Sequence, residues 1–323
     1  MSIDAALLNW MLDSDPALRW QVEQDLAASP PEVWRATRAR VATEGLGTRM
    51  LALQDADGQW AGGAYFPGDY DFHGSEAAQP GQPWTATTWS LNALREWGVD
   101  ASVLAGTADK LAANSRWEYE NLPYWGGEVD ACINGFTIAN GAWLGADVTG
   151  LANWFVEHSM AEGGWNCDWV EGSTRASFHS TINSLEGILS YEVRGNASVE
   201  LRAARHAAEE YLLERHLTRK LSTADPLGVW LDRFTYPARW QFTALRAVNY
   251  FRAASLQDAT EPDPRIAEAV DLVRALRQSD GTWLQGPSDP GRVWFAVDVP
   301  EGEPSKWVTF LATRALLWWD SNR

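Results

Sequence analysis

Cysteine, basic residues and long apolar runs are scarce in this sequence, and each shortage excludes a class of protein. The 323 residues include 2 Cys, and 26 Lys and Arg stand against 43 Asp and Glu, which gives a net charge of −17. A chain this acidic is not expected to bind nucleic acid, because phosphate binding needs a basic surface. No apolar run approaches the roughly 18 residues that a membrane span needs, so no transmembrane segment is predicted.

The two cysteines and the first residues bear on the cellular compartment. Cys132 and Cys167 could form one disulfide at most. The N-terminal stretch MSIDAALLNW carries an early acid and no basic segment, which is not the pattern of a secretion signal. Reduced thiols or metal ligands are therefore favoured over a disulfide, and the cytoplasm is the expected location.

Tryptophan, by contrast, is abundant, with 20 residues. So many large aromatic side chains indicate either a repeated packing motif or a cavity lined by aromatic rings. The chain is 46% hydrophobic and 21% charged, which is typical of a globular protein. Nothing in the sequence marks a domain boundary, so residues 1–323 are predicted to form a single domain.

A glycine followed closely by a tryptophan recurs at the ends of predicted helices. Each copy is typical of a helix that glycine terminates, with the tryptophan folded back onto the helix end. A second amphipathic helix follows each turn after a short loop, and a repeat of this length usually indicates stacked helix pairs. The copies are Asp57-Gly58-Gln59-Trp60, Gly163-Gly164-Trp165, Asp280-Gly281-Thr282-Trp283 and, more loosely, Trp125-Gly126-Gly127.

Two alternating sets of six helices are expected, which together close a ring of helical hairpins. The predicted fold is therefore all-α, a single (α/α)6 toroid. Strand signals are nearly absent, although 293–299 alternates and could be a hairpin arm, and the aromatic-rich loops 61–83 and 284–304 are expected to fold over one mouth of the ring. One set of helices is 3–13, 31–53, 101–114, 149–161, 199–216 and 264–278; the other is 15–26, 83–97, 131–145, 178–191, 237–253 and 305–319.

The tryptophan turns at 54–60 and 278–283 resemble the QW repeats of the α/α-toroid superfamily. That superfamily includes squalene and other class II terpene cyclases and the β subunits of protein prenyltransferases, and many bacterial chains loosely labelled squalene cyclase look similar. The fold resemblance covers nearly all of the chain. The acid motif of class II cyclases, Asp-x-Asp-Asp, is missing, and Asp69-Tyr70-Asp71 is the nearest stretch to it.

Residues 129–187 resemble the zinc site of the prenyltransferase β subunits, which has Asp-x-Cys at the start of one inner helix and a histidine at the start of the next. The resemblance implies zinc as the cofactor, Asp130, Cys132 and His179 as its ligands, and an isoprenoid-like or other small-molecule substrate. Cys167 has no counterpart in that motif, but the Cys-Cys-His zinc of lanthionine cyclases, which share the toroid, is similar. The β subunits work with a helical-repeat partner, and nothing in this sequence identifies a partner subunit.

The residues themselves support a site at one mouth of the ring. Cys132 and His179 begin consecutive inner helices, whose N-termini would converge and favour thiolates, carboxylates and anionic substrates. Thiolate, imidazole and carboxylate are zinc ligands, and three of them leave a position open for chemistry. Cys167 lies on the loop before His179 and could reach the same place. Asp130 could bind the metal or cap its helix, so whether Asp130 or Cys167 completes the site stays open.

Further candidates for catalysis or substrate binding share this mouth. Arg239 and Lys306 would supply positive charge for a diphosphate or a carboxylate, and tryptophans could stabilise a cation. The remaining histidines, His73, His158, His206 and His216, are expected on the surface or in loops. The candidate catalytic residues are Asp130, Asp71, Tyr236, Arg239 and Lys306.

These patterns predict a zinc-dependent enzyme that activates a thiol, water or carbonyl of a small or apolar substrate. One alternative is a metal-free terpene cyclase with Asp69, Asp71 or Asp130 as the proton donor. Another is a toroid that binds or scaffolds without catalysis. A third is a carbohydrate-active (α/α)6 enzyme with paired carboxylates, of which Glu128 or Asp130 could be one.

Overall fold

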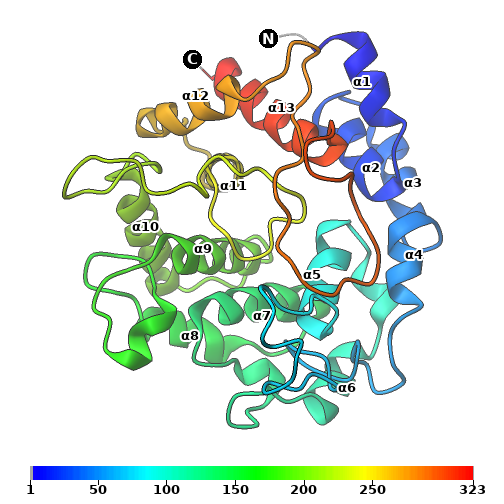
Figure 1. Ribbon diagram of the computed structural model, residues 1–323, viewed down its shortest axis with the longest axis vertical. Coiled ribbons are helices and arrows are strands. Elements are labelled where there is room, and N and C mark those ends of the chain that lie inside the picture. The colour runs from blue at the N-terminus through cyan, green and yellow to red at the C-terminus, as the bar shows by residue number, and fades with distance from the viewer. Residues whose placement is uncertain (1–2, 323) are drawn as a thin grey trace.

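Helices make up the regular structure of this protein, as Figure 1 shows for a computed structural model that describes residues 3–322. Isolated β-bridges are present in these residues, but no strand is, so the expected all-α class is confirmed. No described helix is long and apolar enough to cross a membrane. The α-helices are α1 Ala5–Leu12, α2 Pro16–Asp25, α3 Pro31–Arg40, α4 Gly45–Leu51, α5 Thr87–Glu96, α6 Thr107–Asn114, α7 Ala131–Leu144, α8 Thr149–Glu157, α9 Phe178–Glu192, α10 Val199–Leu213, α11 Ala244–Asp258, α12 Ala267–Ala275 and α13 Lys306–Ser321.

Three sequence expectations about these elements were wrong. Residues 31–53 are not one helix: α3 ends at Arg40, and the chain re-enters a helix only at Gly45, whose backbone is left-handed. The helix expected at 237–253 begins only at Ala244, where the Thr243 hydroxyl caps its N-terminus. The alternating stretch 293–299 forms no strand; instead the indole of Trp294 donates a hydrogen bond to Ser90.

Many helices that follow one another in the chain pack against one another, among them α2 with α3, α9 with α10 and α11 with α12, and the last helix returns to the first two. In Figure 1, α7, α9, α11 and α13 lie nearer the middle of the molecule, while α4, α8, α10 and α12 lie toward its periphery. α13 packs on α1 and α2. Asp25 at the end of α2 lies 3.2 Å from the guanidinium of Arg314 in α13, so an ion pair joins the two ends of the chain.

The recurring tryptophan joins the two helices of each hairpin. Its indole N–H donates to a carbonyl in the preceding helix, over 2.9 Å from Trp60 to Met50, 3.0 Å from Trp165 to Phe155 and 2.8 Å from Trp283 to Val273. The expectation that this ring folds back onto the helix end is thereby confirmed. The glycine before each one has a positive φ, which lets the chain reverse at the helix end.

The same three tryptophans also contact the first turn of the following helix, which the sequence analysis missed. The backbone N–H of Trp60, Trp165 and Trp283 donates to the hydroxyl of Thr87, Thr181 and Thr309, over 3.1, 3.2 and 2.9 Å. All three threonines are buried. We call each such pair, with its indole bond, a Trp–Thr clamp, because it fixes the end of one helix to the start of the next.

The helices α7 and α9 cross at two glycines. A Cβ atom at Gly187 would lie 2.3 Å from the carbonyl oxygen of Gly135, and one at Gly135 would lie 2.3 Å from that of Asn183. Only residues without side chains therefore allow the two backbones to approach this closely. The crossing sets the separation of the N-termini of α7 and α9, where the candidate site lies.

Replacing Gly187 by alanine is expected to destabilise the fold by about 1–3 kcal/mol, because the added methyl forces apart two backbones that cannot rotate away. The midpoint of urea unfolding, followed by circular dichroism, measures this effect. Gly150→Ala in α8 is the matched control, since a Cβ atom there meets nothing within 4 Å. The control should unfold at the same or a higher urea concentration. Equal midpoints for the two variants would contradict the close crossing.

Candidate active site

The two cysteines of the chain lie side by side. Cys132 is the second residue of α7, and Cys167 begins a short 3-10 helix, Cys167–Glu171, two residues after the Trp–Thr clamp of Trp165. Their sulfur atoms are 3.2 Å apart, both side chains are partly buried, and both thiols are free. The structure thus brings Cys167 from the loop to the start of the helix that carries Cys132.

Ser180, in the first turn of α9, orients Cys167. The Cys167 backbone N–H donates to the Ser180 hydroxyl over 3.1 Å, and that hydroxyl donates to the Cys167 sulfur over 3.3 Å. The hydrogen bond shared by the two sulfurs lowers the pKa of the Cys167 thiol and raises that of Cys132. Cys167 is therefore the thiol that loses its proton first and the better nucleophile or metal ligand.

Two carboxylates precede α7, and one of them, that of Asp130, bonds to a thiol. Asp130 precedes α7 but makes no capping hydrogen bond with its side chain. Burial, followed by the negative charge of Asp168, raises the pKa of Asp130, while a hydrogen bond with Cys167 lowers it. The Asp130 backbone N–H donates to Glu128 over 2.6 Å, and burial raises the pKa of Glu128 to about 7. The carboxylate of Asp130 therefore serves the thiol pair, not the helix end.

The ring of His179, in the first turn of α9, contacts the segment that precedes α11. Its Nδ1 accepts a hydrogen bond from the backbone N–H of Phe242 over 2.8 Å. Burial, with a smaller effect of the Arg246 charge, lowers its pKa to about 4, so the ring is neutral and carries its proton on Nε2. The ring lies 4.7 Å from that of Trp230 and 5.3 Å from that of Trp240, measured between centroids. In this tautomer His179 is a hydrogen-bond donor and offers no lone pair to a metal.

Three other candidates from the sequence have partners elsewhere. Asp71 is exposed in its loop and accepts a hydrogen bond from the backbone of His73. Tyr236 is buried, and its hydroxyl accepts a hydrogen bond from the indole of Trp97. The ammonium of Lys306 donates to the backbone carbonyl of Asp13. These three side chains therefore make contacts that stabilise the fold.

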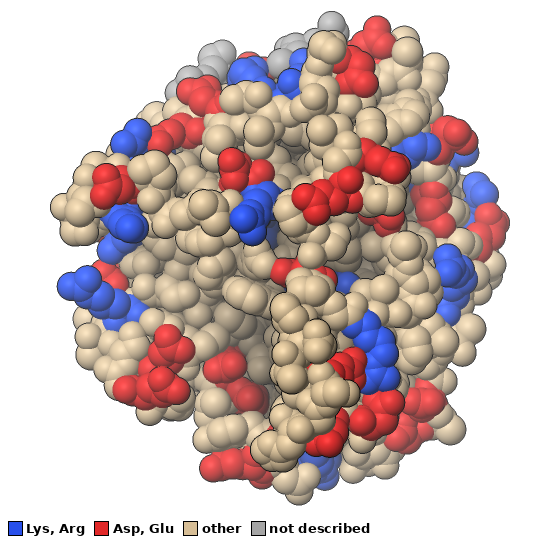
Figure 2. Space-filling model, in the orientation of Figure 1, with Lys and Arg blue, Asp and Glu red and all other residues tan. Residues whose placement is uncertain are grey.

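An aromatic cluster, formed by Tyr65, Trp84, Trp89, Phe136 and Trp240, adjoins the thiols. Burial raises the pKa of Tyr65 well above its usual value, and the charges of Cys132 and Asp130 add to this effect, so Tyr65 stays protonated within electrostatic reach of the thiol pair. Arg239, the remaining candidate from the sequence, lies over the ring of Trp84. Figure 2 shows a hollow over α7 and α9 beside a ridge of mostly uncharged side chains.

Comparison of this chain with protein-family models, with curated proteins and with solved structures gives no match. The functional argument therefore rests on the chemistry of the residues described above.

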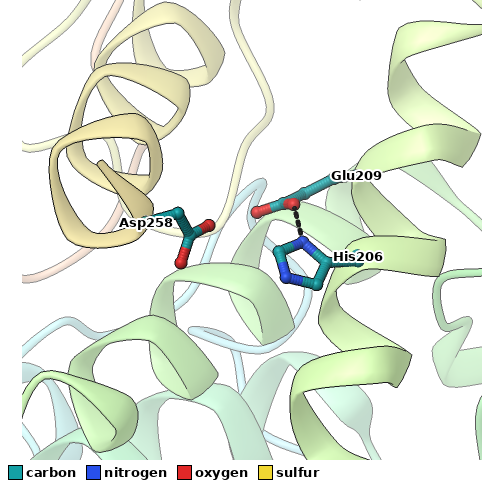
Figure 3. Close-up of side chains that lie close together, drawn as sticks. All are labelled: His206, Glu209 and Asp258. Carbon is teal, nitrogen blue, oxygen red and sulfur yellow. Dashed lines mark hydrogen bonds and ion pairs between the residues drawn. The ribbon is translucent and has the colours of Figure 1, made fainter. Parts of the chain in front are cut away.

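A second cluster of potential ligands lies between α10 and α11. Among the described residues, His206, Glu209 and Asp258 are the only three His, Cys, Asp or Glu side chains whose ligand atoms all lie within 4.8 Å of one another (Figure 3). The His206 Nδ1 lies 2.9 Å from Glu209, whose hydrogen bond raises the pKa of His206. A cavity of about 870 Å³ adjoins these residues. His206 is exposed, as expected, but the sequence analysis did not connect it with Glu209 and Asp258.

Arg205 already neutralises much of this second cluster. Its guanidinium donates to Glu209 over 2.6 Å and to both oxygens of Asp258 over 2.7 and 2.9 Å. The Tyr250 hydroxyl donates to the same Glu209 oxygen. A cation bound here would have to compete with a buried guanidinium, so the cluster is better suited to holding α10 against α11 than to binding a metal.

Proposed function

We propose that this chain is a zinc-dependent enzyme with an (α/α)6 toroid fold, and that its metal is held by Cys132, Cys167 and Asp130. The distance of 3.2 Å between the only two cysteine sulfurs carries the proposal. The fold proposal is supported by the Trp–Thr clamps, which recur from hairpin to hairpin, and by the packing of α13 on α1 and α2.

The donor set fits zinc. Two sulfurs that share a tetrahedral zinc lie about 3.8 Å apart, because each Zn–S bond is about 2.3 Å, and the observed pair needs only a small separation to reach that value. Asp130 bonds to Cys167 and makes no capping bond, so its carboxylate is free to turn toward the metal. Its oxygens and the two sulfurs do not all lie within 4.8 Å of one another, so the Asp130 side chain would have to move closer to serve as the third ligand. Ser180 would orient the Cys167 sulfur from outside the coordination sphere, in the way that neighbouring hydrogen bonds orient metal ligands elsewhere.

Three protein ligands leave one position open, and zinc bound there would activate a thiol, a water molecule or a carbonyl group. The protein's own groups would position the substrate. His179 can donate a hydrogen bond from Nε2, and Trp230 and Trp240 beside it exclude water. Tyr65 remains protonated and can donate a second hydrogen bond. A small or apolar substrate suits such a site, because aromatic rings form most of its surroundings.

Metal analysis of the purified protein, by mass spectrometry of zinc and of the other first-row metals, tests the proposal. The wild-type protein is expected to hold about one zinc per chain, and Cys132→Ala, Cys167→Ala and Asp130→Ala to hold little, because each removes one of three ligands. His179→Ala is expected to keep its zinc, since Nδ1 of that histidine bonds to the backbone of Phe242.

His206→Ala is the matched control, because it disrupts the second cluster and leaves the thiols intact. Zinc that persists in the cysteine variants but disappears from His206→Ala would assign the metal to the second cluster and contradict the proposal. Loss from His179→Ala with retention in Asp130→Ala would replace Asp130 by His179 in the ligand set. A metal-free protein with a Cys132–Cys167 disulfide, seen as a mass two units lower, would also contradict it.

A further inference from the structure

Arg239 is held between aromatic rings. Its guanidinium carbon lies 4.9 Å from the ring centroid of Trp84 and 5.9 Å from that of Trp89. Its backbone has a φ of 48°, in the left-handed region that residues other than glycine rarely adopt. Partly buried arginine and an unfavourable backbone conformation both cost free energy, and such a combination is most common at functional sites.

No described residue accepts a hydrogen bond from the Arg239 guanidinium or lies within ion-pair distance of it. Arginine has five N–H donors. Two other arginines of this protein, Arg246 and Arg292, use theirs in ion pairs. Arg246 makes a two-pronged ion pair with Glu186, at 2.6 and 2.9 Å. Arg292 pairs with Asp69 and Glu76. Burial lowers the pKa of Arg239 to about 10, so the side chain remains charged at neutral pH.

The charges around Arg239 limit what it can bind. Asp289 is the acid whose charge acts on it most strongly, yet Asp289 accepts its hydrogen bond from Gln241, and its second carboxylate oxygen is buried without a partner. Glu96 adds a further negative charge at longer range. A ligand with one negative charge can pair with Arg239, whereas Asp289 would repel a ligand with two or three negative charges more strongly.

The surroundings of Arg239 are apolar on the side that leads to the thiols. Trp84 and Trp89 pack with Phe136 in a cluster that is separate from the main hydrophobic core, and Tyr65 joins that cluster. Tyr65 also lies within electrostatic reach of Cys132. Trp84, Trp89 and Phe136 are almost fully buried, whereas Tyr65 and Trp240 are partly exposed. A ligand whose charged end meets Arg239 would therefore place its apolar part against Tyr65 and Trp240.

We propose that Arg239 binds the carboxylate of an apolar monocarboxylic acid, which is the class of substrate that this site takes. The identification of this acid as the substrate rests on the proposed zinc enzyme, but its binding to Arg239 does not require the metal. Recognition combines a two-pronged guanidinium–carboxylate contact with burial of the apolar chain against Tyr65 and Trp240.

Isothermal titration of decanoate into the purified protein at pH 7.5 tests the inference. Arg239→Gln is expected to weaken decanoate binding by about tenfold to a hundredfold, because it removes a charged hydrogen-bond partner. The decanoate affinity of Arg239→Lys should fall between those of the wild type and Arg239→Gln. Lysine keeps the positive charge but cannot make the two parallel hydrogen bonds of a guanidinium. Arg292→Gln, a nearby arginine that already has acidic partners, should bind like the wild type.

Two further ligands separate the contributions. Decanol should bind wild type and Arg239→Gln with equal affinity, and decyl phosphate should bind the wild type more weakly than decanoate. Asp289→Asn should reduce the difference in affinity between decanoate and decyl phosphate, because it removes the negative charge that repels the phosphate. Equal decanoate affinity in wild type and Arg239→Gln would overturn the inference, as would tighter binding of decyl phosphate than of decanoate.

The cysteine variants distinguish this inference from the proposed metal site. Decanoate binding that survives in Cys132→Ala but is lost in Arg239→Gln supports the arginine site whether or not zinc is present. Binding that is lost in Cys132→Ala and unchanged in Arg239→Gln would mean that the carboxylate binds the metal, which would support the zinc enzyme and overturn the role of Arg239.

Discussion

Replacing Arg205 by alanine is expected to destabilise the folded protein by about 3–5 kcal/mol, because it leaves buried carboxylates without their counter-charge. The side chain of Arg205 is 0% exposed and donates to three acids from three helices, Glu192, Glu209 and Asp258. Burial already raises the pKa of Glu192, and one of its oxygens is buried without a partner, so Glu192 cannot be rehydrated when the guanidinium is removed.

The midpoint of urea unfolding, followed by far-ultraviolet circular dichroism, measures this loss. Arg40→Ala is the matched control, because Arg40 pairs with Glu44 in the same i,i+4 spacing but on the surface, and it should leave the unfolding midpoint almost unchanged. Adding Glu192→Gln to the Arg205→Ala variant should recover part of the loss by removing one buried charge. An Arg205→Ala variant as stable as the control would show that water reaches this cluster.

Trp283→Ala is the second substitution with a large expected effect, about 3–5 kcal/mol, because it leaves a cavity and breaks a Trp–Thr clamp. The side chain is 2% exposed and bonds to Val273 at one end of the turn. Its backbone N–H donates to the Thr309 hydroxyl at the other end of the turn. Trp60→Ala should behave in the same way, since Trp60 is fully buried in an equivalent clamp with Thr87.

Two further substitutions, in the same unfolding assay, separate the contribution of the buried ring from that of the hydrogen bond to Thr309. Thr309→Val leaves the Trp283 ring in place and removes only the hydroxyl that accepts its backbone N–H, so a loss of about 1–3 kcal/mol is expected. Trp34→Ala removes an equally large ring that is only partly buried, and the loss should be much smaller. If Trp34→Ala and Trp283→Ala lower the free energy of unfolding equally, the clamp adds no stability beyond that of any tryptophan ring.

The existence of most helices could be predicted from this sequence because local signals determine it, but several of their ends could not. The tryptophan that folds back onto the preceding helix is confirmed at Trp60, Trp165 and Trp283. The glycine before it, expected to terminate the helix, lies six or seven residues beyond the last helical residue. The loop at 237–243 was predicted to be helical because its residues are compatible with a helix. Its conformation depends on distant contacts, such as the bond between Phe242 and His179.

The candidate site could be predicted only in part, for a similar reason. The position of Cys132 at a helix start and of Cys167 on the loop before the next helix follows from the repeat, and the two sulfurs do meet. The orientation of His179 does not follow, because it depends on which of two sides of the helix start its ring faces. The buried ion pairs of Arg205 and the glycine crossing of α7 and α9 also escaped prediction, since both need knowledge of which helices are neighbours.

The Trp–Thr clamp of Trp165 has a consequence for how this protein can vary. Cys167 lies two residues after Trp165, and its backbone bonds to Ser180, the residue next to Thr181 of the same clamp. The sulfur is thus anchored before the chain reaches the mostly exposed turn 172–175, which follows the short helix Cys167–Glu171. That turn can lengthen, shorten or change its residues during evolution, or accept an inserted peptide in the laboratory, without displacing the thiol from its partner.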